Sequence, residues 1–180
     1  DVPGILGSFE STYKTWMRDL SPLDAALWHA DVGEDTWTLG QVCDHVTSVS
    51  AKFLESAQAL ATDGGQTGRR NPFAWLAIDV IGSLPPGRFK VPKNLPPYYA
   101  RFGAPETLGK DQAMGAFATI HGTTHAIADG IAAADRAQKS KHPAAGWLDA
   151  MQWYRMSEMH MRHHLRQWKR LKARLGVQVS

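Results

Sequence analysis

The segment AAGWLDAMQWYRMSEMHMRHHLRQWKRLKARL, residues 144–175, has the clearest helical periodicity in the chain. At about 100° per residue, one arc of this segment gathers apolar side chains together with two histidines. The arc contains Trp153, Ser157, His160, His164, Trp168, Leu171 and Leu175. We therefore predict a long amphipathic helix whose buried face carries His160 and His164.

Three further segments repeat this helical spacing. The first covers residues 5–20 and is stopped by Pro22. The second covers residues 39–62 and follows a capping box that starts at Thr38. The third covers residues 108–137 and is rich in alanine. Four long helices with no convincing alternating strand pattern predict an all-α four-helix bundle.

The connection between the second and third helices is the least regular part of the chain. Residues 64–105 contain glycine-rich and proline-rich runs around one short apolar segment, residues 73–81, which predicts a short helix. Long connections of this kind often form lids or pocket walls. We expect residues 91–99 to form such a wall and this crossover to determine the choice of substrate.

Length and composition are those of one globular domain. The chain has 180 residues, of which 43% are hydrophobic and 21% are charged, unlike the composition of disordered chains. A chain of this length buries a sizeable core without disulfides, and its single cysteine, Cys43, excludes an intramolecular one. We therefore expect residues 1–180 to form a single domain.

Charge and hydropathy limit the expected partners. No apolar run approaches the roughly 18 residues of a membrane span, and residues 1–9 lack the features of a secretory signal. We therefore expect a cytoplasmic location and no membrane partner. The net charge is +3, and the basic residues within 162–174 are interpreted as the solvated face of the last helix. No nucleic-acid-binding motif accompanies them, so nucleic acid is not an expected partner.

His160 and His164 have the spacing that lets two imidazoles on one helical face bind one metal ion. The spacing alone is weak evidence, and the inward orientation of both side chains strengthens it. Met161 stands where zinc proteases of the H-E-x-x-H type have their glutamate, so their general base is missing. His163 falls in the arc of Arg166 and is expected at the surface.

A third metal ligand has to come from another helix. His45 shares the apolar face of the second helix with Val42, Val46, Val49 and Phe53. A histidine on such a face is more often a core residue than a ligand. Burying three imidazoles without a shared partner, however, would leave polar nitrogens unsatisfied. We therefore predict that His45, His160 and His164 bind one divalent metal ion.

The remaining histidines and two polar positions give weaker signals. His121 and His125, four residues apart on the third helix, could line the metal pocket as a general base or a fourth ligand. The commoner outcome for such a pair is a partly exposed helix position. Trp153 and Ser157 are further candidates for the pocket or for the surroundings of the ligands. His29 and His142 receive no role.

Two motifs resemble those of the DinB/YfiT-like superfamily. The first is Trp37-Thr38-Leu39-Gly40-Gln41-Val42-Cys43-Asp44-His45. The second runs from His142-Pro143 through Gly146-Trp147-Leu148 to His160 and His163-His164-Leu165-Arg166-Gln167. The resemblance implies a four-helix bundle with a three-histidine metal site, carried over onto His45, His160 and His164. Members are often homodimers, and we expect the same here.

The superfamily that the chain resembles includes thiol-dependent S-transferases, a maleylpyruvate isomerase and proteins described as metal-dependent hydrolases. Three protein ligands leave an open metal position, as catalysis requires. We therefore expect a metal-dependent transferase or hydrolase that acts on a small molecule. Three imidazoles accept zinc, nickel, iron or copper, of which zinc or nickel is the expected metal, and a low-molecular-weight thiol is the co-substrate of a transferase. The alternatives are a bundle that binds metal and ligand without turnover, and a bundle that has lost its metal.

Overall fold

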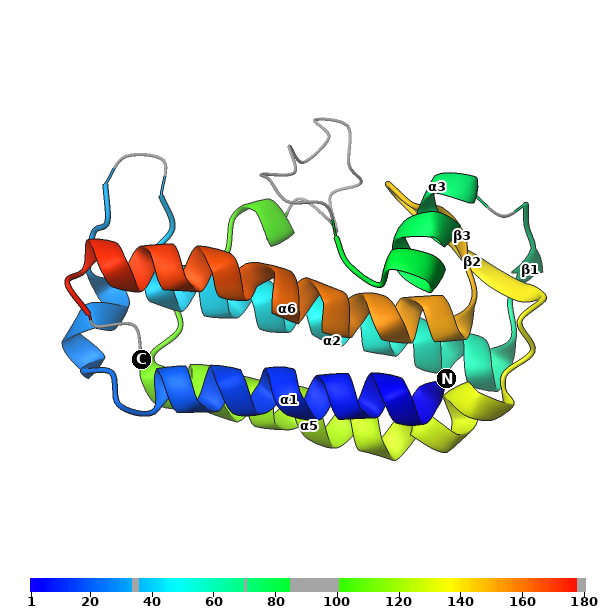
Figure 1. Cartoon of the computed structure of the whole chain (residues 1–180), viewed down its shortest axis with the longest axis horizontal. Helices are drawn as coiled ribbons and strands as arrows, with labels where there is room; N and C mark the ends of the chain where they lie inside the picture. The colour runs from blue at the N-terminus through cyan, green and yellow to red at the C-terminus, as the bar shows by residue number, and fades with distance from the viewer. Residues whose placement is uncertain (34–35, 70, 85–100, 178–180) are drawn as a thin grey trace.

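The computed structural model describes residues 1–33, 36–69, 71–84 and 101–177. Four long helices lie lengthwise beside one another (Figure 1). They are α1 (Val2–Leu20), α2 (Leu39–Asp63), α5 (Lys110–Ala133) and α6 (Ala150–Arg174). The predicted four-helix bundle is confirmed.

The order of the helices around the bundle explains the long crossover. α2 packs mainly on α6 and α5, and α1 packs on the same two helices, so α1 and α2 lie diagonally opposite. α1 and α6 run in one direction, and α2 and α5 run in the other (Figure 1). Because α2 and α5 are parallel neighbours, the chain must return along the whole bundle between them.

Short elements occupy the connections. They are η1 (Ala25–His29) between α1 and α2, and then α3 (Pro72–Trp75), η2 (Leu76–Ile81) and η3 (Arg101–Gly103) in the crossover. The short helix expected at residues 73–81 is therefore present as α3 and η2. The expected pocket wall at residues 91–99 lies outside the described residues.

A small antiparallel sheet corrects the predicted ends of two helices. Strand β2 (Gln138–His142) pairs with β3 (Gly146–Leu148) and with β1 (Gln66–Thr67). The predictions of helix up to residue 137 and of helix from residue 144 are therefore wrong, and the three short strands were not predicted. The sequence signal is weak because the strands are short and do not alternate between apolar and polar residues.

Local turn chemistry accounts for this hairpin. Gly146 adopts a φ of 79°, a left-handed conformation that glycine tolerates best, just after the turn at Pro143. Asp149 and Gln152 then form a capping box that starts α6. α2 likewise begins with the predicted box, in which Thr38 Oγ1 accepts from Gln41 N at 3.2 Å.

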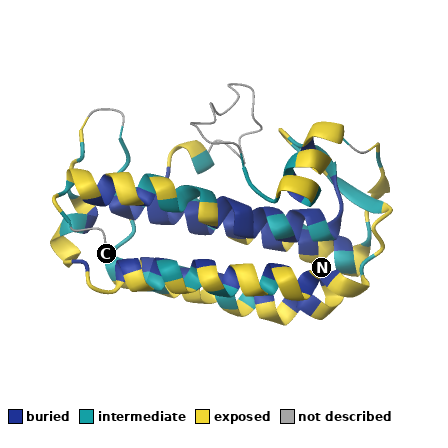
Figure 2. Ribbon diagram, viewed as in Figure 1, coloured by how far each residue is buried: buried dark blue, intermediate teal, exposed yellow. Residues whose placement is uncertain are grey.

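The core runs along the shared axis of the long helices. Figure 2 shows buried residues on their facing sides and exposed residues on their outer sides. At one end, Trp168 packs against Trp16 and Trp28, with ring centroids 5.2 and 6.1 Å apart. Within the described ranges, no helix combines the length and the apolar character needed to cross a membrane.

The interpretation of the basic residues within 162–174 as a solvated face is wrong for Lys172. Lys172 is only 2% exposed, and its Nζ donates to Oδ2 of the buried Asp19 on α1 at 2.9 Å. A buried lysine requires a partner of this kind because an unpaired charge is very costly away from water. Lys172 therefore joins α6 to α1.

Candidate metal centre

Three histidines meet where α2 packs against α6. His45 comes from α2, and His160 and His164 come from consecutive turns of α6. The ring centroids of His45 lie 5.1 Å from His160 and 4.8 Å from His164, and those of the α6 pair lie 4.6 Å apart. One nitrogen of each ring lies within 4.8 Å of the other two. The structure thus brings together the three predicted ligands, and their binding of a metal stays a prediction.

Hydrogen bonds orient two of the rings. Nδ1 of His45 lies 2.7 Å from the carbonyl oxygen of Phe102, and Nδ1 of His164 lies 2.8 Å from Oε1 of Gln167. Both partners are acceptors, so each Nδ1 carries the hydrogen. The lone pair of each ring is therefore on Nε2, the nitrogen left for a metal.

His160 closes the site on its buried side. Its Nε2 lies 3.3 Å from Nε2 of His45, and its Nδ1 is buried with no hydrogen-bond partner among the described residues. Two nitrogens bound at roughly 2.0–2.1 Å to a tetrahedral zinc ion would lie about 3.3 Å apart. The donor set and the spacing of this pair therefore fit a divalent metal ion.

All three imidazoles are held in the neutral form. Burial lowers the pKa of His45, and burial together with the neighbouring histidines lowers the pKa of His160 well below its ordinary value. For His164, burial is again the main cause and lowers the pKa to about 3. A neutral imidazole keeps the lone pair that a metal requires, so these histidines need not lose a proton near pH 7.

The segment before α5 supports His45. Besides the Phe102 carbonyl group, it supplies the amide of Glu106, which donates to Oδ2 of the buried Asp44 at 2.9 Å. Gly40 permits this approach, because a Cβ there would collide with the carbonyl oxygen of Leu108. The end of the crossover thus positions a candidate ligand on α2.

Sequence reasoning missed these supporting groups. Asp44 and Gln167 both stand inside the motifs, each within three positions of a histidine, and this closeness was the available signal. The carbonyl group of Phe102 gives no signal, because every residue has one and only the fold brings this one to His45.

Aromatic side chains surround the histidines. The rings of Trp37 and His45 lie 4.8 Å apart, and those of Phe53 and His160 lie 5.8 Å apart. Trp153 packs behind Phe53 at 5.5 Å, and its Nε1 donates to Ser140 Oγ at 2.9 Å. Trp153 therefore supports this aromatic layer from behind and ties α6 to β2.

Ser157 and His142 have structural contacts. Ser157 is fully buried, and its Oγ donates to the carbonyl oxygen of Ser50, which joins α6 to α2. Nδ1 of His142 accepts hydrogen bonds from the amides of Ala144 and Ala145 in the β2–β3 turn. Burial lowers the pKa of His142 to about 4.

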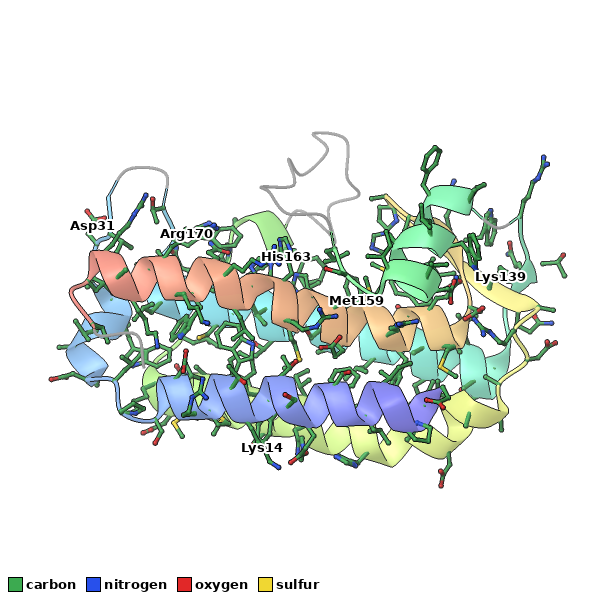
Figure 3. The ribbon with its side chains drawn as sticks, in the orientation of Figure 1. Lys14, Asp31, Lys139, Met159, His163 and Arg170 are labelled. Carbon is green, nitrogen blue, oxygen red and sulfur yellow. The ribbon has the colours of Figure 1, made fainter. Side chains whose placement is uncertain are left out.

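Three other histidines do not belong to the candidate metal centre: His121 and His125 lie away from it, and His163 lies at its edge. His121 and His125 face α1, where Nε2 of His121 lies 2.6 Å from Oε2 of Glu10. They do not line the α2–α6 site, and both are partly exposed. His163 is half-buried on the outer side of α6 (Figure 3), with its ring centroid 5.3 Å from that of His164.

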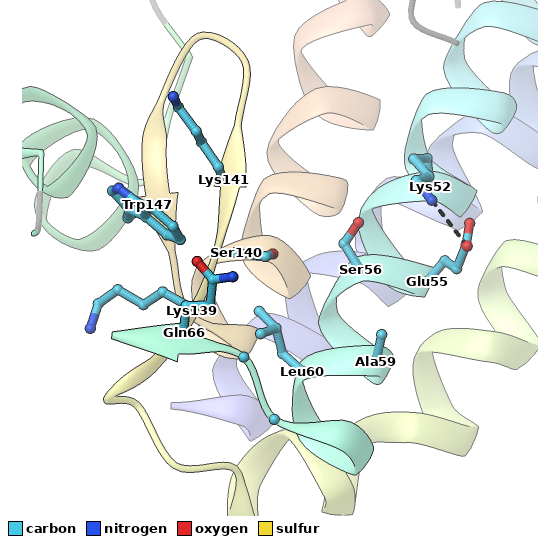
Figure 4. Close-up of a pocket in the computed structure, with 12 residues that line it drawn as sticks. Lys52, Glu55, Ser56, Ala59, Leu60, Gln66, Lys139, Ser140, Lys141 and Trp147 are labelled. Carbon is cyan, nitrogen blue, oxygen red and sulfur yellow. Dashed lines mark ion pairs between the residues drawn. The ribbon is translucent and has the colours of Figure 1, made fainter. Parts of the chain in front are cut away.

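A cleft of about 470 Å³ lies between α2 and the hairpin (Figure 4). Its walls include Ser56 of α2, Ser140 of β2 and Trp147 of β3. On the α2 side, Lys52 pairs with Glu55 at 3.0 Å. None of the three central histidines lines this cleft, so it is distinct from the candidate metal centre.

Comparisons with known proteins agree with this architecture. The family model described as the DinB superfamily matches residues 8–168. The chain is also similar to the crystal structure of TT2238, described as a four-helix bundle protein. That similarity has a TM-score of 0.57 and 17% sequence identity, and covers 94% of this chain and 99% of that chain. At this identity the likeness concerns the fold alone. No curated protein sequence matches the chain.

Proposed function

This chain belongs to the DinB superfamily, and from that membership and its convergent histidines we propose that it is a metal-dependent enzyme. The proposed ligands are His45, His160 and His164. Zinc and nickel are the proposed metals, because imidazole nitrogen suits both. The proposed reaction is thiol-dependent group transfer to a small molecule, with hydrolysis as the second candidate.

The orientation of the rings carries the proposal. Hydrogen bonds from Nδ1 of His45 and His164 to oxygen acceptors leave the lone pair of each ring on Nε2, the arrangement found in metal-ligating histidines. Such bonds also make the ring better at donating electrons to a metal. Histidines that only fill the core would not need to bring one nitrogen of each ring within 4.8 Å of the other two.

The surroundings favour a thiol over water as the nucleophile. A divalent metal held by three imidazoles has an open coordination position and acidifies a thiol or water bound there. Met161 stands where the H-E-x-x-H proteases place their general base, so that route to hydrolysis lacks its key residue. Trp37 and Phe53 provide apolar surface beside the site, against which the carbon chain of an organic thiol can pack, whereas water gains nothing from such a surface.

Metal analysis and turnover assays test this proposal together. The protein is loaded with zinc or nickel and analysed for bound metal, then assayed with a panel of low-molecular-weight thiols and electrophiles. We expect turnover that a chelator abolishes, that metal restores and that His160→Ala lacks. His29→Ala, at an exposed position, is the matched control. Turnover that His160→Ala retains would contradict the proposal, and metal binding without any turnover would favour a binding protein.

Assembly and location are also proposed. We propose a homodimer, on the basis of the family resemblance, and a cytoplasmic location, since the single cysteine offers no use for an oxidising compartment. Light scattering at micromolar protein tests the first proposal, and a monomeric mass would contradict it.

A further inference from the structure

A second group of ligand-type side chains lies between α1 and α5, across the bundle from the histidine centre. Glu10 comes from α1, and His121 and His125 come from consecutive turns of α5. Nε2 of His121 lies 2.6 Å from Oε2 of Glu10, and Nε2 of His125 lies 3.9 Å from the same oxygen. One donor atom from each residue lies within 4.8 Å of the other two.

We infer that Glu10, His121 and His125 form a second divalent-metal site, independent of His45, His160 and His164, that takes zinc or nickel. Two histidines four apart with one carboxylate are a common donor set for such ions. Tetrahedral zinc would place these donors about 3.3 Å apart, between the two observed distances. All three side chains are partly exposed, at 37%, 27% and 51%, so they have room for this small adjustment.

Neighbouring residues orient two of the three side chains. The ring of Tyr13 stacks on His121 with centroids 4.2 Å apart and planes at 18°, which limits rotation of the imidazole. Lys14 pairs with Oε1 of Glu10 at 3.0 Å, which leaves Oε2 directed at the histidines. Lys14 lies on the side of α1 turned away from α6 (Figure 3).

The protonation state of Glu10 agrees with this assignment. Its hydrogen bond with His121 is the main cause that lowers its pKa to about 2, with Lys14 contributing. The carboxylate is therefore ionised near neutral pH and available as a ligand.

The competing explanation is a simple hydrogen bond between Glu10 and His121. That explanation does not involve His125, whose ring lies edge-on to that of His121 with centroids 4.8 Å apart and whose Nε2 lies beyond hydrogen-bond distance of Glu10 at 3.9 Å. A metal site needs both histidines. His125→Ala therefore separates the two explanations, because it leaves the Glu10–His121 contact intact.

A metal ion at this position would join α1 to α5. Ligands that bind only the folded state stabilise it by mass action. Zinc should therefore raise the melting temperature through this site even when the α2–α6 centre has been removed. This readout does not depend on enzyme activity or on the identity of any substrate.

Zinc titration by calorimetry, with thermal unfolding of the same samples, tests the inference. We expect two zinc ions per wild-type chain, and one in His125→Ala and in Glu10→Gln. His29→Ala should bind two, and Mg²⁺ should not bind at the new site because it prefers oxygen ligands. In His160→Ala, zinc should still raise the melting temperature, and adding His125→Ala should abolish that rise.

The inference is overturned if His125→Ala and Glu10→Gln bind as much zinc as wild type with the same affinity. That result would leave the α2–α6 proposal untouched, whereas unchanged zinc binding in His160→Ala would contradict that proposal alone. Because Glu10 and His125 are partly exposed, both substitutions should leave the fold intact. The zinc stoichiometry of these two variants, compared with that of wild type, therefore tests the inference even if His160→Ala unfolds.

Discussion

His160 and His163 are three residues apart on α6 but lie in different surroundings. His160 is 8% exposed with Nε2 turned to His45, whereas His163 is half-buried on the outer side of the helix. At the scale of single residues, the direction of a side chain therefore decides whether an imidazole can be a ligand.

Alanine substitutions should separate ligands from neighbours. His45→Ala, His160→Ala or His164→Ala should each remove most of the metal bound at the α2–α6 centre, because two imidazoles make a poor site. His163→Ala should leave it nearly unchanged. Metal stoichiometry by native mass spectrometry, in a background lacking His125, is the measurement. Loss of metal in His163→Ala with retention in His160→Ala would require a different ligand pair.

His142 should make the metal-free protein sensitive to acid. An unfolded histidine has a pKa of about 6.5, whereas burial lowers the pKa of His142 to about 4 in the folded chain. Between these values only the unfolded state takes up the proton. The stability present above pH 6.5 is therefore lost as the pH falls towards 4, by about 2 kcal/mol at pH 5.

Urea unfolding at pH 7.5 and pH 5 measures this effect. His142→Asn can still accept from the amides of the hairpin turn but does not titrate, so its stability should fall by about 2 kcal/mol less than that of wild type. His29→Asn controls for the loss of an imidazole at an exposed position. Equal losses in wild type and His142→Asn would show that His142 has no part in the acid response.

At the scale of elements, the end of the crossover packs closely against α2 and so holds His45 in place. A Cβ at Gly40 would meet the carbonyl oxygen of Leu108, and would lie 2.8 Å from Cγ2 of Thr107. A backbone carbonyl group cannot yield without moving its segment. That segment leads back to the Phe102 carbonyl group that orients His45.

Gly40→Ala should therefore weaken metal binding without removing a ligand. We expect a loss of roughly 10-fold or more in metal affinity, the size seen when a group that supports a ligand is lost. Gly115→Ala on α5 is the matched control, because a Cβ there meets nothing within 4 Å. The control should keep its metal affinity and gain about 0.5–1 kcal/mol in free energy of unfolding. Wild-type affinity in Gly40→Ala would show that the segment does not hold His45.

For the whole molecule, most of the hydrophobic core lies outside the metal centre. The buried apolar side chains run the length of the bundle, whereas the three histidines occupy one short part of one interface. A bundle of this kind keeps its core when the metal is removed, unlike a small domain folded around zinc.

Chelation should accordingly lower stability but preserve the helices. After dialysis against a chelator, far-UV circular dichroism should remain dominated by helix, and the melting temperature should fall relative to the metal-loaded protein. A collapse of the helical signal on chelation would show that the metal is part of the core.

Helices, their caps and their buried faces could be predicted from the sequence because they depend on residues a few positions apart. The spacing of apolar side chains predicted the four long helices, the Thr38 box marked the start of α2, and the arc of α6 put His160 inward. The hairpin at residues 138–148 was missed because its strands are stabilised by pairing with each other and with β1, which no local periodicity records.

The sequence by itself determined the helices, their buried faces and two pairs of histidines at metal-binding spacing. Only the tertiary structure decided what each pair faces. The α6 pair meets His45 on α2, whereas the α5 pair meets Glu10 on α1, 111 residues before His121. The physical reason is that spacing along a helix fixes the direction of a side chain relative to its own axis. The neighbour in that direction depends on how the four helices pack, through contacts between residues far apart in the chain.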